Sequence, residues 1–246
     1  MPRMRATKIE YEYRFFVIGG IFFLGFFLYN LDPVPFSVAL IRLVAPSVDL
    51  DHGGIVWFKL LIALGALLVF FAALFRTWAT AYLRTDVVHD APLHTEALVA
   101  DGPYRYVRNP LYFANVPMAV GMGLMASRAG WFFMVAAMIL AMLRLIGREE
   151  EELLKTQGDS YRAYLKAVPR FLPALTPRVE GGGRPARWGQ AFAGEMFIWL
   201  IGAAELCFAI TLSLKIAGIV LAGSFVVYFL AVYLVKKSAG QSEPSA

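Results

Sequence analysis

Two short polar clusters in this hydrophobic chain have residue types that bind and orient a charged ligand. The stretch GPYRYVRNPLY, residues 102–112, holds two arginines, two prolines, an asparagine and three tyrosines. The stretch REEEE, residues 148–152, places four glutamates in a row. A basic, aromatic loop facing an acidic helix start can hold a zwitterionic ligand with an aromatic ring, because carboxylates and aromatic faces both attract cations. The alternative is that the glutamates form an ordinary solvated helix face.

The segments that must position these clusters are long and apolar. Of the 246 residues, 59% are hydrophobic and only 17% are charged, against about 25% charged in a typical soluble domain. The apolar segments are residues 15–31, 55–75, 110–127, 129–143, 188–214 and 216–235. Crossing a bilayer takes about 20 residues, with about 17 as the lower limit, which the fourth segment reaches if its helix continues through Leu145 and Ile146. We therefore predict an all-α, polytopic membrane protein with about six transmembrane helices.

The basic residues predict the orientation of these helices. With both termini on one side, that side receives most of the 23 lysines and arginines, including those of loops 76–109 and 144–187. The positive-inside rule then places both termini and both loops in the cytoplasm. The helical hairpin 110–143, which turns at Ser127-Arg128, returns the chain to the same face. We therefore expect residues 102–112 and Glu149 to lie close together in a pocket at the cytoplasmic face.

The chain divides into three parts on this scheme. Residues 1–75 carry the first two transmembrane helices, and the basic N-terminus is expected to be a retained first helix because no signal cleavage site follows it. Residues 76–178 hold the central hairpin and the two polar loops. The stretch VEGGGRPAR, 179–187, is typical of a flexible linker. Residues 188–236 form a C-terminal hairpin containing Glu195 and Glu205. Either both acids border the entry or headgroup of a lipid substrate, or Glu195 lies at the membrane interface and Glu205 makes a helix-to-helix hydrogen bond.

The order of motifs in the central part resembles that of a known family. The pattern G-x-Y-x-x-x-R-[HN]-P-x-Y is followed, after a helical hairpin, by E-E-x-x-L, G-x-x-Y-x-x-Y and V-P-x-x-x-P. These elements stand here as Gly102, Tyr104, Arg108, Asn109, Pro110 and Tyr112, then Glu149, Glu150, Leu153, Gly158, Tyr161, Tyr164, Val168, Pro169 and Pro173. The set is similar to the isoprenylcysteine carboxyl methyltransferase and phospholipid methyltransferase group of integral membrane enzymes.

The resemblance implies a pocket for S-adenosylmethionine and an S-adenosylmethionine-dependent methyl transfer. The residues it assigns to the cofactor are Glu96, Leu98, Val99, Gly102, Tyr104, Asn109, Pro110, Leu111, Tyr112 and Glu149. The arginines it assigns to catalysis are Arg108 and Arg144. Arg144 stands beside Leu145, which occupies the place of an arginine that meets the substrate's carboxylate in family members acting on prenylated cysteine. In those members histidine usually stands where this chain has Asn109.

The resemblance also implies a methyl acceptor dissolved in the bilayer. The acceptor is a membrane lipid or lipidated molecule, either like an isoprenylcysteine carboxylate or like a phospholipid, and O- and N-methylation remain alternatives. His89 and His94, in the first polar loop, are more simply ordinary loop residues than a catalytic base. Three histidines without close spacing argue against a metal site. The net charge of +5 does not indicate nucleic-acid binding, because basic residues in a membrane protein first report its orientation.

Two other classes of function are compatible with parts of this sequence. A membrane sterol-type reductase would bind NADPH at a similar polar turn, although the acidic run REEEE disfavours a phosphorylated dinucleotide. A non-catalytic transporter would carry charges within paired broken helices, for which only Glu195 and Glu205 argue. The sequence leaves the oligomeric state open.

Overall fold

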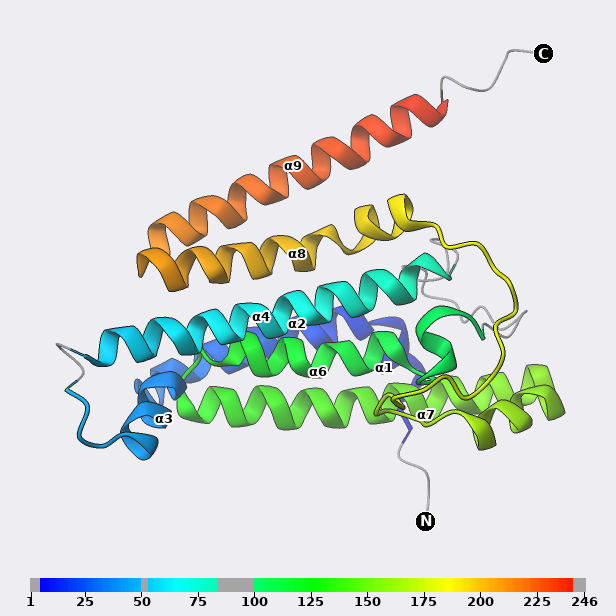
Figure 1. The fold of residues 1–246 in the computed structure, drawn as a ribbon, viewed down its shortest axis with the longest axis horizontal. Helices are drawn as coiled ribbons and strands as arrows, with labels where there is room; N and C mark the ends of the chain where they lie inside the picture. The colour runs from blue at the N-terminus through cyan, green and yellow to red at the C-terminus, as the bar shows by residue number, and fades with distance from the viewer. Residues whose placement is uncertain (1–4, 50–52, 84–99, 241–246) are drawn as a thin grey trace.

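The structure, a computed structural model, describes residues 5–49, 53–83 and 100–240, with side chains described to residue 230. Regular structure in these ranges is helical throughout and contains no β-strand, which confirms the all-α prediction. Five helices run side by side along the long axis of the molecule: α2, Arg14–Phe27; α4, Gly54–Ala81; α6, Pro110–Gly123; α7, Arg128–Ala167; and α8, Trp188–Thr211 (Figure 1). Helix α9, Leu214–Gly240, packs mainly on α8 and diverges from the others.

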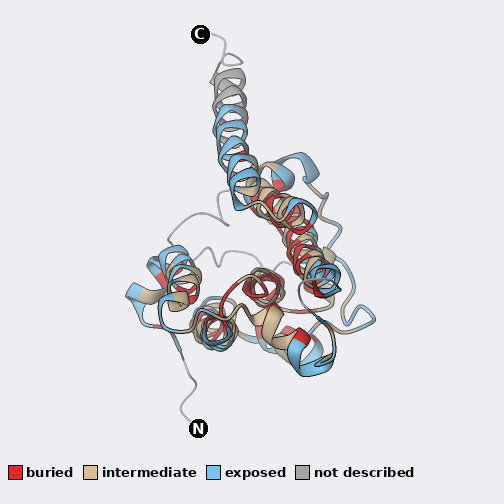
Figure 2. Cartoon of the chain, turned by 90° about the vertical axis from the view of Figure 1, so that its left-hand side faces the viewer, coloured by how far each residue is buried: buried red, intermediate tan, exposed pale blue. Residues whose placement is uncertain are grey.

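Three of these helices are long and apolar enough to cross a membrane, namely α4, α7 and α8. Shorter apolar helical stretches cover Arg14–Asn30 and Leu214–Leu230. The end-on view shows buried residues facing the centre of the bundle and exposed ones facing outward, most of all along α9 (Figure 2). Many of the outward residues are leucines, isoleucines and phenylalanines, as expected of a surface that faces lipid.

Each apolar segment predicted from the sequence forms a helix, but several boundaries differ. Helix α4 continues past Phe75 to Ala81, and α6 ends at Gly123 instead of Ser127. Helix α7 runs through the whole glutamate cluster to Ala167, interrupted by Gly158 with φ of 54°. Helices α4 and α7 continue into polar residues because the length of an apolar segment does not determine where a helix ends outside the membrane.

Four short helical segments complete the fold, and all but η1 lie outside the apolar segments predicted from the sequence. They are α1, Lys8–Glu12; η1, Leu28–Asn30; α3, Phe36–Val44; and η2, Gly102–Arg105. Helix α3 buries only Ser37 and Ile41 and is too short to cross a bilayer. Helix α1 begins with a capping box, in which the Thr7 hydroxyl accepts from the Glu10 amide and the Glu10 carboxylate accepts from the Thr7 amide.

The α6–α7 hairpin is closed by a tight turn, as predicted. Ser127 caps α7 by accepting from the Gly130 amide at 3.0 Å. Asp32 accepts from the Arg128 guanidinium at 3.0 Å and from the Ala129 amide at 3.1 Å. These contacts hold the end of α2 against the hairpin turn. The start of α6 and the polar part of α7 therefore lie together at the other end of the bundle. We call this the motif end, because it carries residues 102–112 and 148–152.

Glycines allow the helices to cross closely at two points. Helices α4 and α6 meet at Gly65 and Gly121, where a Cβ added to Gly65 would lie 2.8 Å from the Gly121 carbonyl oxygen. Helices α2 and α7 meet at Gly25 and Gly130, where an added Cβ at Gly130 would collide with the Gly25 carbonyl oxygen. Small residues at such crossings let backbones approach each other inside a membrane.

The α4–α6 crossing yields a packing prediction. A methyl group at Gly121 would collide with the Gly65 carbonyl oxygen and press on Leu68 and Val69, so Gly121→Ala should destabilise the protein by about 1–3 kcal/mol. Gly19→Ala is the matched control, because nothing lies within 4 Å of an added Cβ there. Thermal unfolding in detergent compares the two variants, and equal midpoints would contradict the packing role.

The segment predicted to be a flexible linker is instead held against the motif end. The Asp101 carboxylate accepts from the Gly183 amide at 3.0 Å and from the Arg184 amide at 3.4 Å. The Arg105 guanidinium donates to the Val179 carbonyl at 2.9 Å. The composition correctly indicated loop structure, but tertiary hydrogen bonds fix its path, which corrects the expectation of a free linker.

Candidate functional site

The two polar clusters meet at the motif end through a buried ion pair. Arg108 contacts Glu150, with Nη2 2.9 Å and Nε 3.1 Å from the carboxylate oxygen Oε1. Glu150 is only 5% exposed. The Asn109 amide group donates to the same oxygen at 3.4 Å and to the Arg170 carbonyl at 2.9 Å. The hairpin thus brings both clusters to one place, and Glu150 contacts the arginine of the first motif directly.

Arg108 also joins the first motif to the last. Its guanidinium donates to the Leu165 and Val168 carbonyls at the end of α7, and its own amide donates to the Pro169 carbonyl at 2.9 Å. The catalytic role assigned to Arg108 stays a prediction. The contacts that the structure gives this side chain hold the loop after α7 against the start of α6.

The tyrosines of the third motif lie in a small hydrophobic core. Tyr161, Tyr164 and Val168 form a buried cluster, and the Tyr164 hydroxyl donates to the Tyr104 carbonyl at 2.7 Å. Tyr104 is itself 8% exposed, and burial raises its pKa well above the ordinary value. This cluster holds η2 against the end of α7. The spacing of the tyrosines in the third motif therefore has a role in packing.

Glu149 contacts the last tyrosine of the first motif. Its carboxyl group is hydrogen-bonded to the Tyr112 side chain, which is also hydrogen-bonded to the Tyr11 side chain of α1. Glu149 lies just beyond the apolar part of α7. Burial raises the pKa of its carboxyl, while the Tyr112 hydrogen bond and the positive charge of Arg14 act in the opposite direction. By exposure Glu149 is only partly buried, and a carboxyl whose pKa desolvation raises is one whose charged form gains stability from an added cation.

The neighbouring glutamates have different surroundings. Glu151 forms an ion pair with Arg5 at 2.7 Å and another with Lys155 at 3.3 Å. Glu152 pairs with Lys155 at 3.0 Å. Both side chains are about one-third exposed. The run therefore combines one buried acid, Glu150, with Glu149, which is partly buried beside Tyr112, and with two acids that pair with cations at the surface.

The N-terminal segment packs over this part of α7, a contact that the sequence analysis missed. The Ala6 amide donates to the Arg144 carbonyl at 2.8 Å, and Arg144 pairs with Glu10 at 2.8 Å. The Arg144 hydrogen bond lowers the pKa of Glu10 to about 2. Arg144 is thus bound to α1, and its assigned catalytic role stays a prediction. The T-x-x-E capping box at Thr7 was the available signal for α1, although it does not reveal where the helix docks.

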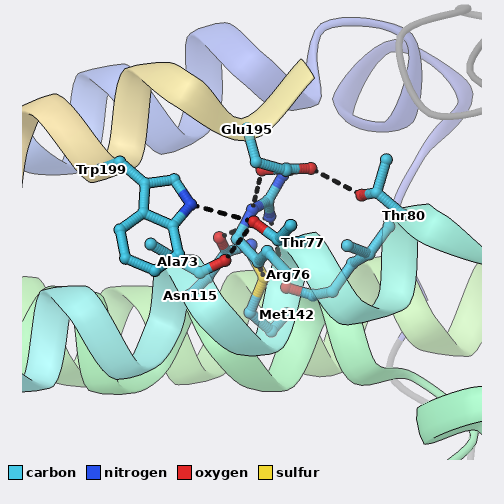
Figure 3. A network of polar contacts seen from close by, with 9 residues as sticks. Ala73, Arg76, Thr77, Thr80, Asn115, Met142, Glu195 and Trp199 are labelled. Atoms are coloured by element: carbon cyan, nitrogen blue, oxygen red, sulfur yellow. Dashed lines mark hydrogen bonds and ion pairs between the residues drawn. The ribbon is translucent and has the colours of Figure 1, made fainter. Parts of the chain in front are cut away.

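A second polar network lies between α4, α6 and α8 (Figure 3). Arg76 pairs with Glu195 at 2.7 Å, and the Thr80 hydroxyl donates to the same carboxylate at 2.8 Å. Arg76 also donates to the Asn115 side chain at 3.1 Å and to the Leu111 carbonyl at 3.4 Å. This network connects the C-terminal hairpin to the first turns of α6. The partner of Arg76 could not be predicted from the sequence, because Glu195 lies 119 positions away.

Glu205, the other carboxylate of α8, is placed differently. It is 2% exposed and lies against Gly65, and neither of its oxygens has a hydrogen-bond partner among the residues that the structure describes. The helix-to-helix hydrogen bond that one sequence alternative assigned to Glu205 is made instead by Glu195, to Arg76 and Thr80 of α4. Glu205 is buried where α8 passes the α4–α6 crossing, away from the motif end.

The remaining predicted site residues fall into two groups. Gly102 has φ of 54° and an added Cβ there would collide with the Tyr82 ring, so glycine is required at this position. Pro110 and Leu111 form the first turn of α6. Glu96, Leu98 and Val99 lie outside the described residues, as do His89 and His94.

Comparison with known proteins gives a family match over the central part. Residues 60–158 match the family model described as phospholipid methyltransferase. The chain is 28% identical over 141 residues to the nickel-cobalt-cadmium resistance protein NccN of Alcaligenes xylosoxydans xylosoxydans, covering 57% of this chain and 62% of that protein. It is 28% identical over 117 residues to the cobalt-zinc-cadmium resistance protein CzcN of Cupriavidus metallidurans, covering 48% and 51%.

The chain therefore spans less than two thirds of the length of either relative. No solved structure matches it. The family match begins within α4 and ends within α7, so it includes residues 102–112, the hairpin and all four glutamates. Through residues 60–158, the central part of this chain is therefore similar to the phospholipid methyltransferase family.

Proposed function

We propose that the protein transfers a methyl group from S-adenosylmethionine to a lipid or lipidated acceptor held in the bilayer. The observation that carries this proposal is the contact between Glu149 and Tyr112, which joins two motifs of the matched segment. The apolar helices α4, α7 and α8 support a membrane location for the reaction. The sequence prediction that the motif end is cytoplasmic agrees with a water-soluble methyl donor.

The residues at the motif end fit the charge of this cofactor. Its ammonium and sulfonium groups are cationic, and Glu149 is a partly buried carboxyl whose charged form gains from an added positive charge. Tyr104 and Tyr112 supply aromatic surfaces suited to such cations. Glu149, Asn109 and the first turn of α6 would hold the cofactor, together with Glu96, Leu98 and Val99 from the preceding loop. When bound, it supplies an electrophilic methyl group.

The protein's part in such a transfer is positional. Displacement at a methyl carbon requires the acceptor atom, the methyl group and the sulfur in line, and positioning alone contributes roughly 7–11 kcal/mol. The Arg108–Glu150 pair and the Arg76–Glu195 network hold the start of α6 from two sides. We assign Arg108 a positioning role through these contacts, in addition to the catalytic role that the resemblance implies.

The surroundings of position 145 favour a phospholipid-like acceptor over a prenylcysteine carboxylate. Leu145 is 2% exposed and packs in the hydrophobic core. The adjacent Arg144 is paired with Glu10. Leu145 is not the arginine that the resemblance associates with a substrate carboxylate, and Arg144 is already paired with another acid. Both observations support an acceptor that has no carboxylate.

Cofactor binding should depend on pH through Glu149. Because burial raises its pKa above the ordinary value of 4.5, the carboxylate that pairs with an ammonium group is lost as the pH falls through this raised value. The affinity for S-adenosylhomocysteine should therefore decrease on acidification at a pH where an exposed glutamate is still charged. In the Glu149→Gln variant, the affinity for S-adenosylhomocysteine should no longer decrease over this acidic pH range. A Glu149→Gln profile identical to that of the unaltered protein would contradict the assignment.

A titration of the detergent-purified protein separates this function from its alternative. We expect S-adenosylhomocysteine to bind and NADPH to compete poorly, because the buried acids repel an additional phosphate. Tight NADPH binding without S-adenosylhomocysteine binding would support the reductase alternative. Binding of neither ligand would contradict both enzyme proposals.

A further inference from the structure

A basic hollow opens beside the loop that follows α7. It measures about 410 Å³, which is within the usual range for small-ligand sites of about 300–1,000 Å³. Its lining residues that carry charge are Arg108, Lys166, Arg170 and Arg178, and it has no acidic lining residue. Four cations around one hollow select for an anionic ligand.

The charges of this hollow are only partly neutralised. Glu150 is the nearby acid, and it contacts both Arg108 at 2.9 Å and Arg170 at 3.0 Å. Lys166 and Arg178 are exposed, and neither has an ion-pair partner among the residues that the structure describes. At the end of α7, the Leu165 and Val168 carbonyls, which would repel an anion, accept hydrogen bonds from Arg108. The hollow therefore keeps an excess of positive charge.

Two exposed leucines lie on the same loop. Leu172 is 69% exposed and Leu175 is 99% exposed. The preceding Phe171 packs edge-on against Phe113 in the first turns of α6, with ring centroids 6.0 Å apart. This contact holds the loop at the depth where an apolar helix of the bundle begins. A surface that combines exposed leucines with basic residues is suited to binding at the interface of an anionic bilayer.

We propose that this hollow binds the phosphate-bearing headgroup of an anionic bilayer lipid, with Leu172 and Leu175 contacting its acyl region. A free phosphate ion would use the cations alone and would leave the leucines without a role. The site is distinct from the Glu149–Tyr112 contact, and its occupancy does not require a methyl donor.

The test compares charge variants that remove the same number of cations. The probe is short-chain phosphatidylglycerol, titrated into the purified full chain in uncharged detergent without cofactor. Lys166→Gln combined with Arg178→Gln should weaken binding about 30-fold, or about 2 kcal/mol at 1.4 kcal/mol per tenfold, since each basic residue near an anionic lipid contributes about 1 kcal/mol. The control is Lys155→Gln combined with Arg162→Gln, whose cations already pair with Glu151, Glu152 and Asp159.

The control variant should bind phosphatidylglycerol nearly as tightly as the unaltered protein. Equal losses in the two charge variants would show nonspecific attraction and overturn the proposal. Leu172→Ser combined with Leu175→Ser should also weaken the binding of phosphatidylglycerol while leaving the binding of inorganic phosphate unchanged. If inorganic phosphate displaces the lipid at similar concentration and the leucine variant binds normally, the site takes a free anion and the lipid proposal is wrong. None of these outcomes bears on methyl transfer, because no cofactor is present.

Discussion

Glu149→Gln is expected to lower the affinity for S-adenosylhomocysteine by about 10- to 150-fold. A hydrogen bond to a charged group contributes about 1.5–3 kcal/mol, and each 1.4 kcal/mol is tenfold in affinity. Glu149 is the carboxyl that contacts Tyr112, and its partial burial means that a cation would stabilise its charged form. Glutamine keeps the size and the hydrogen-bonding capacity of the side chain but removes the negative charge. Isothermal titration of the purified variant measures the effect.

Glu151→Gln provides the matched control on the same helix. Two residues further along, Glu151 points about 200° away from Glu149, and it pairs with Arg5 and Lys155 at the surface. Its replacement should leave cofactor affinity within about twofold, as for most surface substitutions. Equal affinities of the two folded variants would return the glutamate run to the role of a solvated helix face.

Glu195→Gln is expected to destabilise the protein by roughly 3–5 kcal/mol, because removing one partner of a buried ion pair leaves the other charge uncompensated. Glu195 is 2% exposed and accepts from both Arg76 and Thr80. Because Arg76 also donates to the Leu111 carbonyl, the loss should loosen the start of α6. Thermal unfolding in detergent reports the destabilisation, and cofactor titration reports the effect on the site.

Replacing both partners distinguishes a charge effect from general damage. Arg76→Met combined with Glu195→Met should recover much of the stability, because apolar pairs often substitute for buried ion pairs at little cost. Arg128→Gln, at an exposed pair with Asp32, should leave the unfolding midpoint close to that of the unaltered protein. A double variant as unstable as Glu195→Gln alone would contradict the ion-pair explanation.

The helices and the meeting of the motifs could be predicted from the sequence, because both depend on local properties. Apolar runs of sufficient length form helices in a membrane, and a helical hairpin returns the chain to the face it left. The same reasoning placed residues 102–112 near Glu149. Helix ends were less predictable, as the extension of α7 through its polar residues shows, since apolar length says nothing of where a solvated helix stops.

The pairing of individual charges could not be predicted. Glu149 and Glu150 are neighbours on one helix, and their sequence does not tell which meets Arg108 and which meets Tyr112. The docking of α1 on α7 and the pairing of Arg76 with Glu195 join residues more than 100 positions apart. Such contacts depend on how the helices pack, and the packing is set by features such as the Gly65–Gly121 crossing.

The most direct test of the proposed function is the fate of a labelled methyl group. Purified protein is incubated with S-adenosylmethionine, labelled in the methyl group, and a total lipid extract, and the products are separated into organic and aqueous phases. We expect the label to enter the organic phase with the unaltered protein and to be greatly reduced there with Glu149→Gln. Label found only in water-soluble products, or organic-phase label that is unchanged in Glu149→Gln, would contradict the account.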